Sequence, residues 1–501
     1  MFHDRVFRTA CASAIAAVAI AWAGAAEEAG APAAAWSVPA EGSCAPEGGL
    51  RGWPPGEDAP PIPFETGDVL DLEAAPRLAN YLPPAIWTHR EQFFFEGMQL
   101  EIGPCFRDYG PPVFFAAASE TFRGRARLLD NGGLENYTAG LPFAPDAIEP
   151  SDPQAGLKWA WNVEHRYQGA GFRGKFRVSD MVGRTRRAEP FEGEIFKIHL
   201  AYRADRAADA YEAPGSKSSH WVAGGQMFQP FDAREYAWRQ YRDVAHLVEP
   251  RRSDDLHVYL PTRRRVRRTS AADVEGLYMP SFSVGVTDRG GQLPIAGAAD
   301  LGGTGGSVDV GGGGASTITT KRSGFEGLEL RPLLYRYEIL GLQDVLAPIN
   351  AVRASYPAVT DRDFGPSGLS FASDRWDLRR ALVLQGTAGA EKRGAGELAR
   401  VVQYVDLQTL QPLYYISFDA NGEPLDVGYY VGRWSEDRAE YPPWPNDPER
   451  SVRVLDPVGA AFANIQESGG WRRESWEVVS TPPSDETVQR MLSIQNLTKR
   501  R

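Results

Sequence analysis

The chain has 501 residues, enough for several domains or for one large β unit. Its formal net charge of -11 argues against general nucleic-acid binding, because a phosphate backbone requires a basic surface. The 52 glycines, 38 prolines and 11% aromatic residues favour turns and strands over long helices. The composition therefore predicts a mainly β protein with a sizeable core.

Residues 1–25 have the pattern of a secretory signal peptide. Arg5 and Arg8 precede the apolar run Ala10–Ala21, and Ala23–Ala25 provides a cleavage site of the A-x-A type. The apolar run is too short for a membrane span, which needs about 20 residues. We therefore expect an exported chain whose mature form is soluble or peripheral to a membrane.

Two cysteines, Cys44 and Cys105, would remain after the signal and Cys11 are removed. A pair of cysteines in an exported chain is a candidate disulfide, with two free thiols as the alternative. Such a bond would tie the Pro/Ala/Gly-rich arm of residues 26–63 to the first strand. A loop of about 60 residues would add about 4 kcal/mol to stability in the chain-entropy model.

The first half of residues 64–501, predicted to form a single domain, alternates short helices with strands. Pro76, Pro83 and Pro84 interrupt the early helical patterns. Asp152-Pro153 is typical of a helix start. The pattern at Asp232–Val248 fits either a helix or a strand. The predicted elements are helices over Asp68–Leu82, Ala85–Phe95 and from Asp152 to Gly169, and strands through Met98, Leu100 and Ile102 and over Ile195–Tyr202.

The second half is richer in strand patterns. Residues 290–324 are glycine-rich and lack large apolar groups, which predicts a flexible insertion. Asn421-Gly422 predicts a tight hairpin turn. A helix with a stripe of apolar residues is expected from Ser484. The predicted strands are Leu328–Leu342, Leu378–Leu384, Val401–Leu407, Leu413–Phe418 and Leu425–Trp434.

An arginine-rich strand is the most distinctive segment. Leu256, Val258 and Leu260 alternate as in a half-buried strand, and five arginines then occupy six positions, 263–268. Clustered cations need anions beside them. Acidic side chains of neighbouring strands or an anionic ligand could supply these charges.

No motif identifies a catalytic, cofactor or metal site. The six histidines after the signal have no partner at i+4, and a zinc enzyme normally brings three ligands with recognisable local spacing. No G-x-S-x-G elbow is present, and Gly302–Gly314 lacks the lysine of a phosphate-binding loop. The aromatic clusters suit a core, with the lining of an apolar cavity as the alternative.

Several short segments together resemble a family of Gram-negative envelope proteins often labelled outer-membrane lipoprotein-sorting proteins, which is similar to the LolA/LolB carriers. The arginine segment is the most specific of them, although Thr262-Arg263 stands where the family usually has glycine. The segments are Thr66-Gly67-Asp68-Val69-Leu70, Gly140-Leu141-Pro142-Phe143, Trp161-Asn162 with Arg166-Tyr167, Tyr259-Leu260-Pro261 with Arg264-Arg265-Val266-Arg267-Arg268, and Asp406 with Pro412-Leu413-Tyr414.

The resemblance implies a large, curved antiparallel sheet, or incomplete β-barrel, with helices in its concave face. It implies a non-enzymatic periplasmic carrier or chaperone for lipid or acylated ligands, and work beside an inner-membrane lipid exporter or an outer-membrane protein. An accessory protein that binds such a partner and an uncharacterised hydrolase are the alternatives. The outer-membrane surface is a further expected location. The candidate ligand contacts are Arg264, Arg265, Arg267, Arg268, Trp161, Tyr259 and Tyr415.

Overall fold

The structure is a computed structural model. It describes residues 36–42, 44, 63–182, 186–187, 190–206, 218–250, 252–261, 264–271, 276–279, 281–283, 287–288, 291–292, 308–309, 317–319, 328–356, 362–389, 398–445, 447, 449–465 and 470–498. The predicted signal at 1–25 lies outside these residues. Only residues 291–292, 308–309 and 317–319 of the predicted insertion are described, as short strands.

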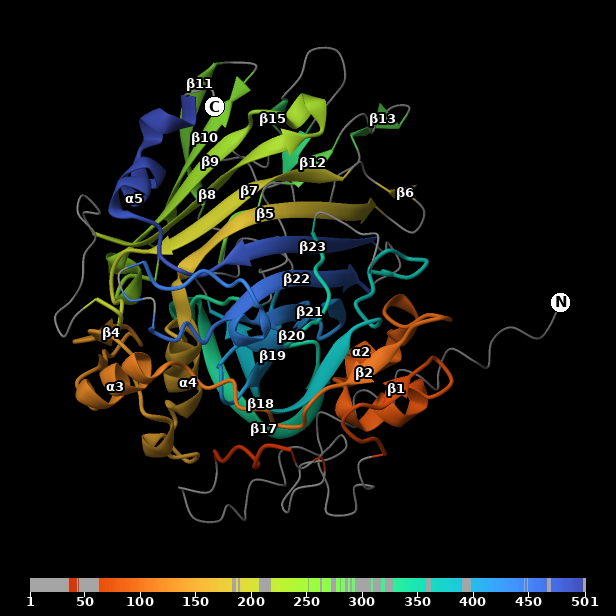
Figure 1. Cartoon of the computed structure of the whole chain (residues 1–501). Helices are drawn as coiled ribbons and strands as arrows, with labels where there is room; N and C mark the ends of the chain where they lie inside the picture. Colours follow the sequence, from red (N-terminus) through yellow and green to blue (C-terminus); the bar gives the residue numbers. More distant parts are fainter. Residues whose placement is uncertain are drawn as a thin grey trace.

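One sheet of 16 strands dominates the molecule (Figure 1). Within the described pairs, neighbouring strands are antiparallel except β2 and β18. The path runs β1 (Val69–Leu70), β2 (Leu100–Ile102), β18 (Arg375–Ala388), β19 (Arg400–Asp406), β20 (Pro412–Phe418), β21 (Pro424–Trp434), β22 (Leu455–Asn464), β23 (Gly470–Val479), β5 (Gln168–Val182), β7 (Phe191–His199), β8 (Ser219–Gln229), β9 (Ala237–Asp243), β10 (Asp254–Leu260) and β11 (Arg265–Ala271), while β17 (Tyr335–Ala347) pairs with β18 and β6 (Arg186–Arg187) with β5.

The sheet curls around one face. Figure 1 shows this curvature. The core on that face contains side chains from strands as far apart in the strand order as β10 and β18. The path nevertheless ends at β1 and β11 without closing. The predicted fold, a large curved sheet that forms an incomplete barrel, is confirmed.

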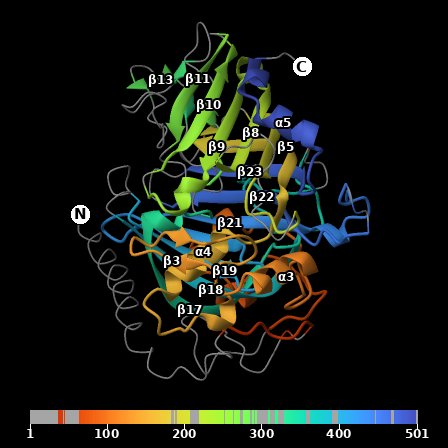
Figure 2. The same ribbon diagram turned by 90° about the vertical axis from the view of Figure 1, so that its left-hand side faces the viewer.

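Helix α4 (Ala155–Glu164) lies in the concave face. Figure 2 shows α4 in front of β18 and β19. Trp159 and Val163 of α4 pack with Leu382 of β18 and Val405 of β19. Because strand side chains alternate between faces, the neighbours of Leu382 belong to a different core on the convex face. The expectation of a helix inside the curved sheet is confirmed by α4.

The other helical segments do not all share this position. Helix α2 (Pro84–Thr88) and the 3-10 helices η3 (Ala75–Tyr81) and η4 (Arg90–Gln92) belong to the segment that packs on the convex face of β18–β22. Helix α5 (Asp485–Leu492) packs through Val488 on Phe196 and Ile198 of β7, also on the convex face. Helix α3 (Val113–Thr121) follows β2.

Most predicted elements are present, with shifted ends. The four late strands are β18 to β21, and Ser484 caps α5 as expected. The ambiguous segment at 232–248 contains β9 between two 3-10 helices, so the strand alternative is right. The two early helices are wrong in length: Asp68–Leu82 contains β1 and the 3-10 helix η3, and Ala85–Phe95 consists of α2 followed by the 3-10 helix η4. The strand predicted from Leu328 begins only at Tyr335, since Pro332 starts a 3-10 helix.

The hairpin between β20 and β21 is present, but its turn differs from the predicted one. Only Gly422 adopts a positive φ, at 85°, while Asn421 does not. The Asp419 carboxylate accepts hydrogen bonds from the backbone N–H groups of Asn421 and Glu423. An aspartate in this position nucleates a local turn, so a second left-handed residue is not needed.

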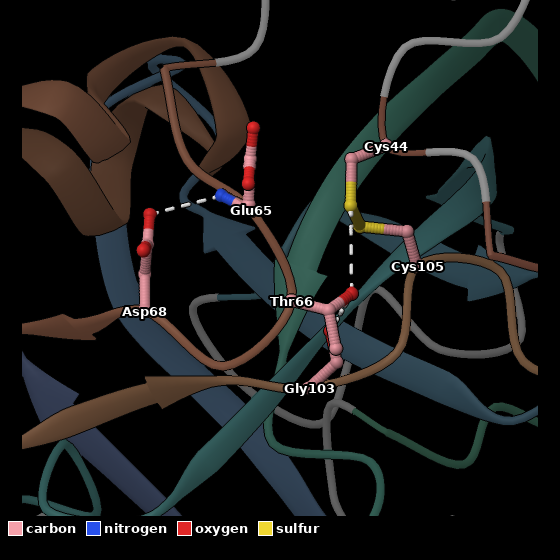
Figure 3. Close-up of a disulfide and its surroundings, with 6 residues drawn as sticks. All are labelled: Cys44, Glu65, Thr66, Asp68, Gly103 and Cys105. Atoms are coloured by element: carbon pink, nitrogen blue, oxygen red, sulfur yellow. Dashed lines mark hydrogen bonds between the residues drawn. A yellow bond between two sulfur atoms is a disulfide. The ribbon is translucent and has the colours of Figure 1, made fainter.

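A disulfide joins Cys44 to Cys105, as predicted, with their Cα atoms 5.1 Å apart (Figure 3). The Thr66 hydroxyl lies beside it, 3.7 Å from Cys44 Sγ and 3.4 Å from the Gly103 carbonyl oxygen. Because a disulfide sulfur carries no proton, the hydroxyl is the donor in both contacts. The bond holds residues of the N-terminal arm against the segment that follows β2.

A buried carboxyl group in β18 leads to a pH-dependent prediction. Asp377 is fully buried and accepts a hydrogen bond from the Tyr109 hydroxyl. Burial raises the pKa of Asp377 from 3.8 to about 6, against the opposing effects of Tyr109 and nearby arginines. The folded state therefore holds this proton more tightly than the unfolded state. The contribution of Asp377 to stability is full below its unfolded pKa and is lost as the pH rises to about 6.

We expect Asp377→Asn to remove this pH dependence, because asparagine stays neutral. At neutral pH the variant should be more stable than the wild type by up to about 3 kcal/mol. Urea unfolding of both proteins at several pH values checks this, since groups common to both cancel in the difference. A stability difference that stays constant between about pH 4 and pH 8 would contradict it.

Candidate functional site

The apolar concave face is covered by two short segments. We call residues 276–279 and 328–334 together the strap. Leu277, Met279 and Leu330 of the strap pack into the same core as the strands beneath them. The strands contribute aromatic, aliphatic and methionine side chains to this face: Phe172, Phe176, Val178, Phe191, Ile195, Trp221, Met227, Trp238, Leu256, Val258, Leu260, Tyr415, Tyr430, Phe462, Trp476 and Val478.

A few polar contacts hold the strap to β9. The backbone N–H of Tyr278 donates to Gln240 Oε1 over 2.7 Å, and Gln240 Nε2 donates to the Gly276 carbonyl over 3.0 Å. The hydroxyls of Tyr278 and Tyr236 lie 3.0 Å apart. Trp238 of β9 belongs to the same core as the strap. Among the described residues, its buried indole N–H has no hydrogen-bond partner. These hydrogen bonds therefore attach residues 276–279 of the strap to Tyr236 and Gln240.

Arg265 and Arg267 lie at the rim of this face. In the pairing of β11 with β10, Arg265 is opposite Leu260 and Arg267 is opposite Val258. Directly opposite residues share a face of the sheet, and both leucine and valine belong to the concave core. Within the described part of the chain, no acidic residue forms an ion pair with either arginine.

Arg268 and Arg264 are placed differently. Arg268 is opposite His257 and therefore points to the convex side, where it forms an exposed ion pair with Asp255 at 2.6 Å. Arg264 is exposed in the turn before β11, with φ of 48°. The acidic neighbour expected for the arginine run is thus present for Arg268.

The predicted aromatic contacts do not gather at one place. Tyr415 is buried in the concave core. Tyr259 is opposite Val266, on the other face of β10 from Leu260. Trp161 of α4 packs with Leu134 and Leu247 in a separate cluster. The structure therefore brings Tyr415 and the two rim arginines to the concave side and separates Trp161 and Tyr259 from them.

A histidine cluster lies at the end of α4. It comprises His165, His199, His220 and His246, together with Glu164. The His220 and His246 rings are stacked at 5.0 Å between centroids, and His165 and His199 lie 5.4 and 5.9 Å from His220. The members come from α4, the end of β7, the start of β8 and the 3-10 helix η7 (Val244–Leu247). One ligand atom from each of Glu164, His220 and His246 lies within 4.8 Å of the other two.

Burial governs protonation in the histidine cluster. It lowers the pKa of His165 to about 3 and the pKa values of His199 and His220 well below their usual range. Burial alone would raise the pKa of Glu164, but contact with His246 and the charge of Arg242 hold it well below normal. His165, His199 and His220 are therefore neutral imidazoles near the Glu164 carboxylate.

Buried ion pairs connect this cluster with the strap, starting from Arg242, which lies 3.6 Å from Glu164. Asp254 is 1% exposed and accepts from Arg242 over 3.0 Å, and it forms a second ion pair with Arg331 of the strap at 3.1 Å. Glu329, also in the strap, pairs with Arg166 at 3.2 Å and lies 3.8 Å from Lys197 Nζ. Charged residues thus anchor one end of the strap.

A small surface pocket of about 50 Å³, partly open to solvent, lies elsewhere, with Tyr109, Phe115, Arg166, Trp434 and Arg453 among its lining residues. None of the predicted contact residues lines it. No described helix is long and apolar enough to cross a membrane.

Sequence reasoning missed the histidine cluster and the polar strap contacts. The histidines lie on four elements that are distant in the chain, so no local spacing could have revealed them. His220 lies at an irregularity in the pairing of β8 with β9, between Ser219 and Trp221, which local residue patterns do not reveal.

Three solved structures are similar to this chain at low identity. A crystal structure of a DUF1329 family protein from Desulfovibrio piger shares 14% identity with a TM-score of 0.39, over 69% of this chain and 100% of that one. An outer membrane lipoprotein-sorting protein domain from Vibrio parahaemolyticus shares 12%, with a TM-score of 0.37, over 70% and 100%. A LolA superfamily protein from Nitrosomonas europaea shares 11%, with a TM-score of 0.29, over 67% and 96%. No curated protein matches the chain.

A family model matches about two thirds of the sequence, at residues 77–282 and 308–433. The match includes the strap, the arginine strand and the histidine cluster, and it ends within β21. Strands β22 and β23, which complete the middle of the sheet, follow it in the chain. The resemblance seen in the sequence is thereby confirmed: the chain belongs to the family described as protein of unknown function (DUF1329).

Proposed function

We propose that the protein is a non-enzymatic periplasmic carrier for an amphipathic ligand with an acyl-like chain and an anionic group. The observation that carries the proposal is the position of Arg265 and Arg267 at the rim of a covered apolar face, without described acidic partners. The acyl chain would lie under the strap against Trp238, Tyr415 and their neighbours. The anionic group would lie at the rim.

An acyl chain would compete with residues 276–279 of the strap for the concave face. Among the described residues, Gly276 and Tyr278 form two hydrogen bonds with Gln240 of β9, and the Tyr278 and Tyr236 hydroxyls form a third; each contributes about 1 kcal/mol net. The buried side chains of Leu277 and Met279 add about 1.5–3 kcal/mol each. A buried methylene group contributes about 0.8 kcal/mol, so a chain of about ten methylenes would offer about 8 kcal/mol. The ligand would thus offer a free energy similar to that of the contacts it replaces.

The rim arginines suit an acidic headgroup. Guanidinium groups bind carboxylate or phosphate through two parallel hydrogen bonds, and they are always charged. Two such groups on alternate positions of one strand would hold the polar end of a ligand while its apolar end is sheltered from water. Arg268, on the opposite face and already paired with Asp255, is not expected to take part.

The double variant Arg265→Gln/Arg267→Gln is expected to bind a fluorescent fatty acid at least about tenfold more weakly than the wild type, since a hydrogen bond to a charged group contributes about 1.5–3 kcal/mol. Fluorescence titration measures this directly, and native mass spectrometry of protein exported to the periplasm reports co-purifying lipid. Arg268→Gln is the matched control and should bind as the wild type does.

The uncharged methyl ester of the same fatty acid tests the binding of the apolar chain without the anionic group. It should bind the wild type and the double variant equally, because it lacks the anionic group. Equal binding of the free acid by the wild type and the double variant would count against a role for the rim. No binding of either probe by folded wild-type protein would count against the carrier itself.

A second function, docking of an acidic partner in the envelope, is favoured by the position of β11. It ends the strand order and presents Arg264, Arg265 and Arg268 to solvent. Charged side chains on an edge strand usually oppose pairing with another strand. A partner would therefore bind through the arginine side chains. In that case Arg268→Glu would reduce crosslinking to a membrane partner, and binding of the fatty acid would be absent.

A further inference from the structure

We propose that Glu164, His220 and His246 bind a divalent transition-metal ion, with Zn²⁺ as the best match to the donor set. Two imidazoles and one carboxylate form a known three-ligand set for zinc, with a water molecule in the fourth position. The proposal rests on the geometry of these three side chains. It does not depend on the ligand proposed for the concave face.

The hydrogen bond of His246 leaves one ring nitrogen available for a metal. His246 Nδ1 lies 2.7 Å from the Asp243 carbonyl oxygen. A carbonyl oxygen only accepts, so Nδ1 carries the proton and Nε2 has the free electron pair in the neutral ring. This arrangement, in which a backbone carbonyl orients the imidazole through its other nitrogen, is usual for histidines that bind metals.

The free nitrogens are buried, which is the second observation. Among the described residues, His246 Nε2 and His220 Nδ1 are shielded from solvent and have no hydrogen-bond partner. A buried polar atom without a partner costs about as much as a lost hydrogen bond, and such atoms are uncommon in native proteins. A metal ion bound by these nitrogens would supply the missing interaction.

A bulge in β8 places His220. The pairing of β8 with β9 shifts by one residue between Ser219 and Trp221, so that His220 has no direct opposite in β9. Bulges bend a strand and redirect a side chain, and they are frequent beside functional sites. Here the extra residue lies where His220 stacks on the ring of His246.

The distances between the three ligand atoms are slightly longer than those in a zinc site. His246 Nε2 lies 3.6 Å from Glu164 Oε1, and all three ligand atoms lie within 4.8 Å of one another. Zinc at its usual bond lengths would hold tetrahedral ligand atoms about 3.3 Å apart. Shifts of about an ångström in the Glu164, His220 and His246 side chains would bring their ligand atoms to this separation.

A nearby cation opposes the binding of a metal ion. Arg242 Nη1 lies 3.6 Å from Glu164 Oε1. Arg242 also pairs with Asp254, which accepts from its Nε and Nη2 over 3.0 Å each. Asp254 is therefore the closer partner of Arg242, and Glu164 Oε1 lies beyond hydrogen-bond distance of its Nη1.

The test is zinc binding by the mature chain, prepared without a polyhistidine tag, stripped with EDTA and titrated with ZnCl₂. Calorimetry and elemental analysis should find one Zn²⁺ per chain. His220→Gln and His246→Gln should each weaken binding at least about a hundredfold, since loss of a supporting contact alone costs 10- to about 100-fold. His257→Gln, on the convex side of β10, is the matched control and should bind as the wild type does.

His246→Cys keeps the test valid if a glutamine variant folds poorly, because a thiolate is also a zinc ligand. This variant should regain zinc binding and should give a thiolate-to-metal absorption band with Co²⁺. Circular dichroism without metal establishes that each variant is folded. The proposal is overturned if folded wild-type protein binds no Zn²⁺, or if both glutamine variants bind it as tightly as the wild type.

Discussion

Replacing Asp254 by asparagine is expected to lower the free energy of unfolding by about 3–5 kcal/mol, because the change leaves two buried arginines without their anion. Asp254 pairs with Arg242 and with Arg331 and also accepts from Gln240 Nε2 over 2.7 Å. Burial alone would raise the pKa of Asp254, yet the two arginines lower it. The carboxylate is therefore ionised in the folded protein and is the anion that the two arginines share.

The neighbouring residue gives a matched control. Asp255 also pairs with an arginine, Arg268, but their side chains are 47% and 67% exposed. Exposed pairs contribute about 0–1 kcal/mol, so Asp255→Asn should change stability little. Urea unfolding of both variants measures the contrast. Similar small losses in both would mean that the buried network does not anchor the strap against β9 and β10.

Removal of the disulfide is the second change with a large expected effect. The variant Cys44→Ala/Cys105→Ala should lose about 4 kcal/mol, because the bond closes a loop with a sequence separation of 61 and restricts the unfolded chain. The effect should be seen as a lower urea midpoint. Limited trypsin digestion should also release the N-terminal arm earlier than in the wild type.

Reduction separates the bond from the substitutions. Wild-type protein treated with a reductant should unfold near the midpoint of the double variant, and the variant itself should not respond to the reductant. A midpoint of the wild type that is the same with and without reductant would contradict the prediction. In that case packing of the buried Cys105 side chain, and not the crosslink, would hold the arm.

The family and the curved sheet could be predicted from the sequence because local signals carry them. Alternation in Leu256–Leu260, the capping serine of α5 and the Asn421-Gly422 pair of the hairpin are properties of short segments. The lengths of the early helices were wrong, since β1 forms within the first and α2 ends at Thr88 in the second. The long strands β5, β8, β22 and β23 were missed, since glycine and charged residues interrupt their apolar alternation.

The sequence by itself determined the strand and turn preferences, the pair of cysteines and the membership of the DUF1329 family. Only the tertiary structure decided which side of β11 each arginine takes, because the register with β10 assigns Arg267 to the concave side and Arg268 to the convex side. It also decided that Glu164, His220 and His246 meet. The physical reason is the same for both. Register and the packing of α4 against the sheet depend on contacts between segments far apart in the chain, which local residue patterns do not encode.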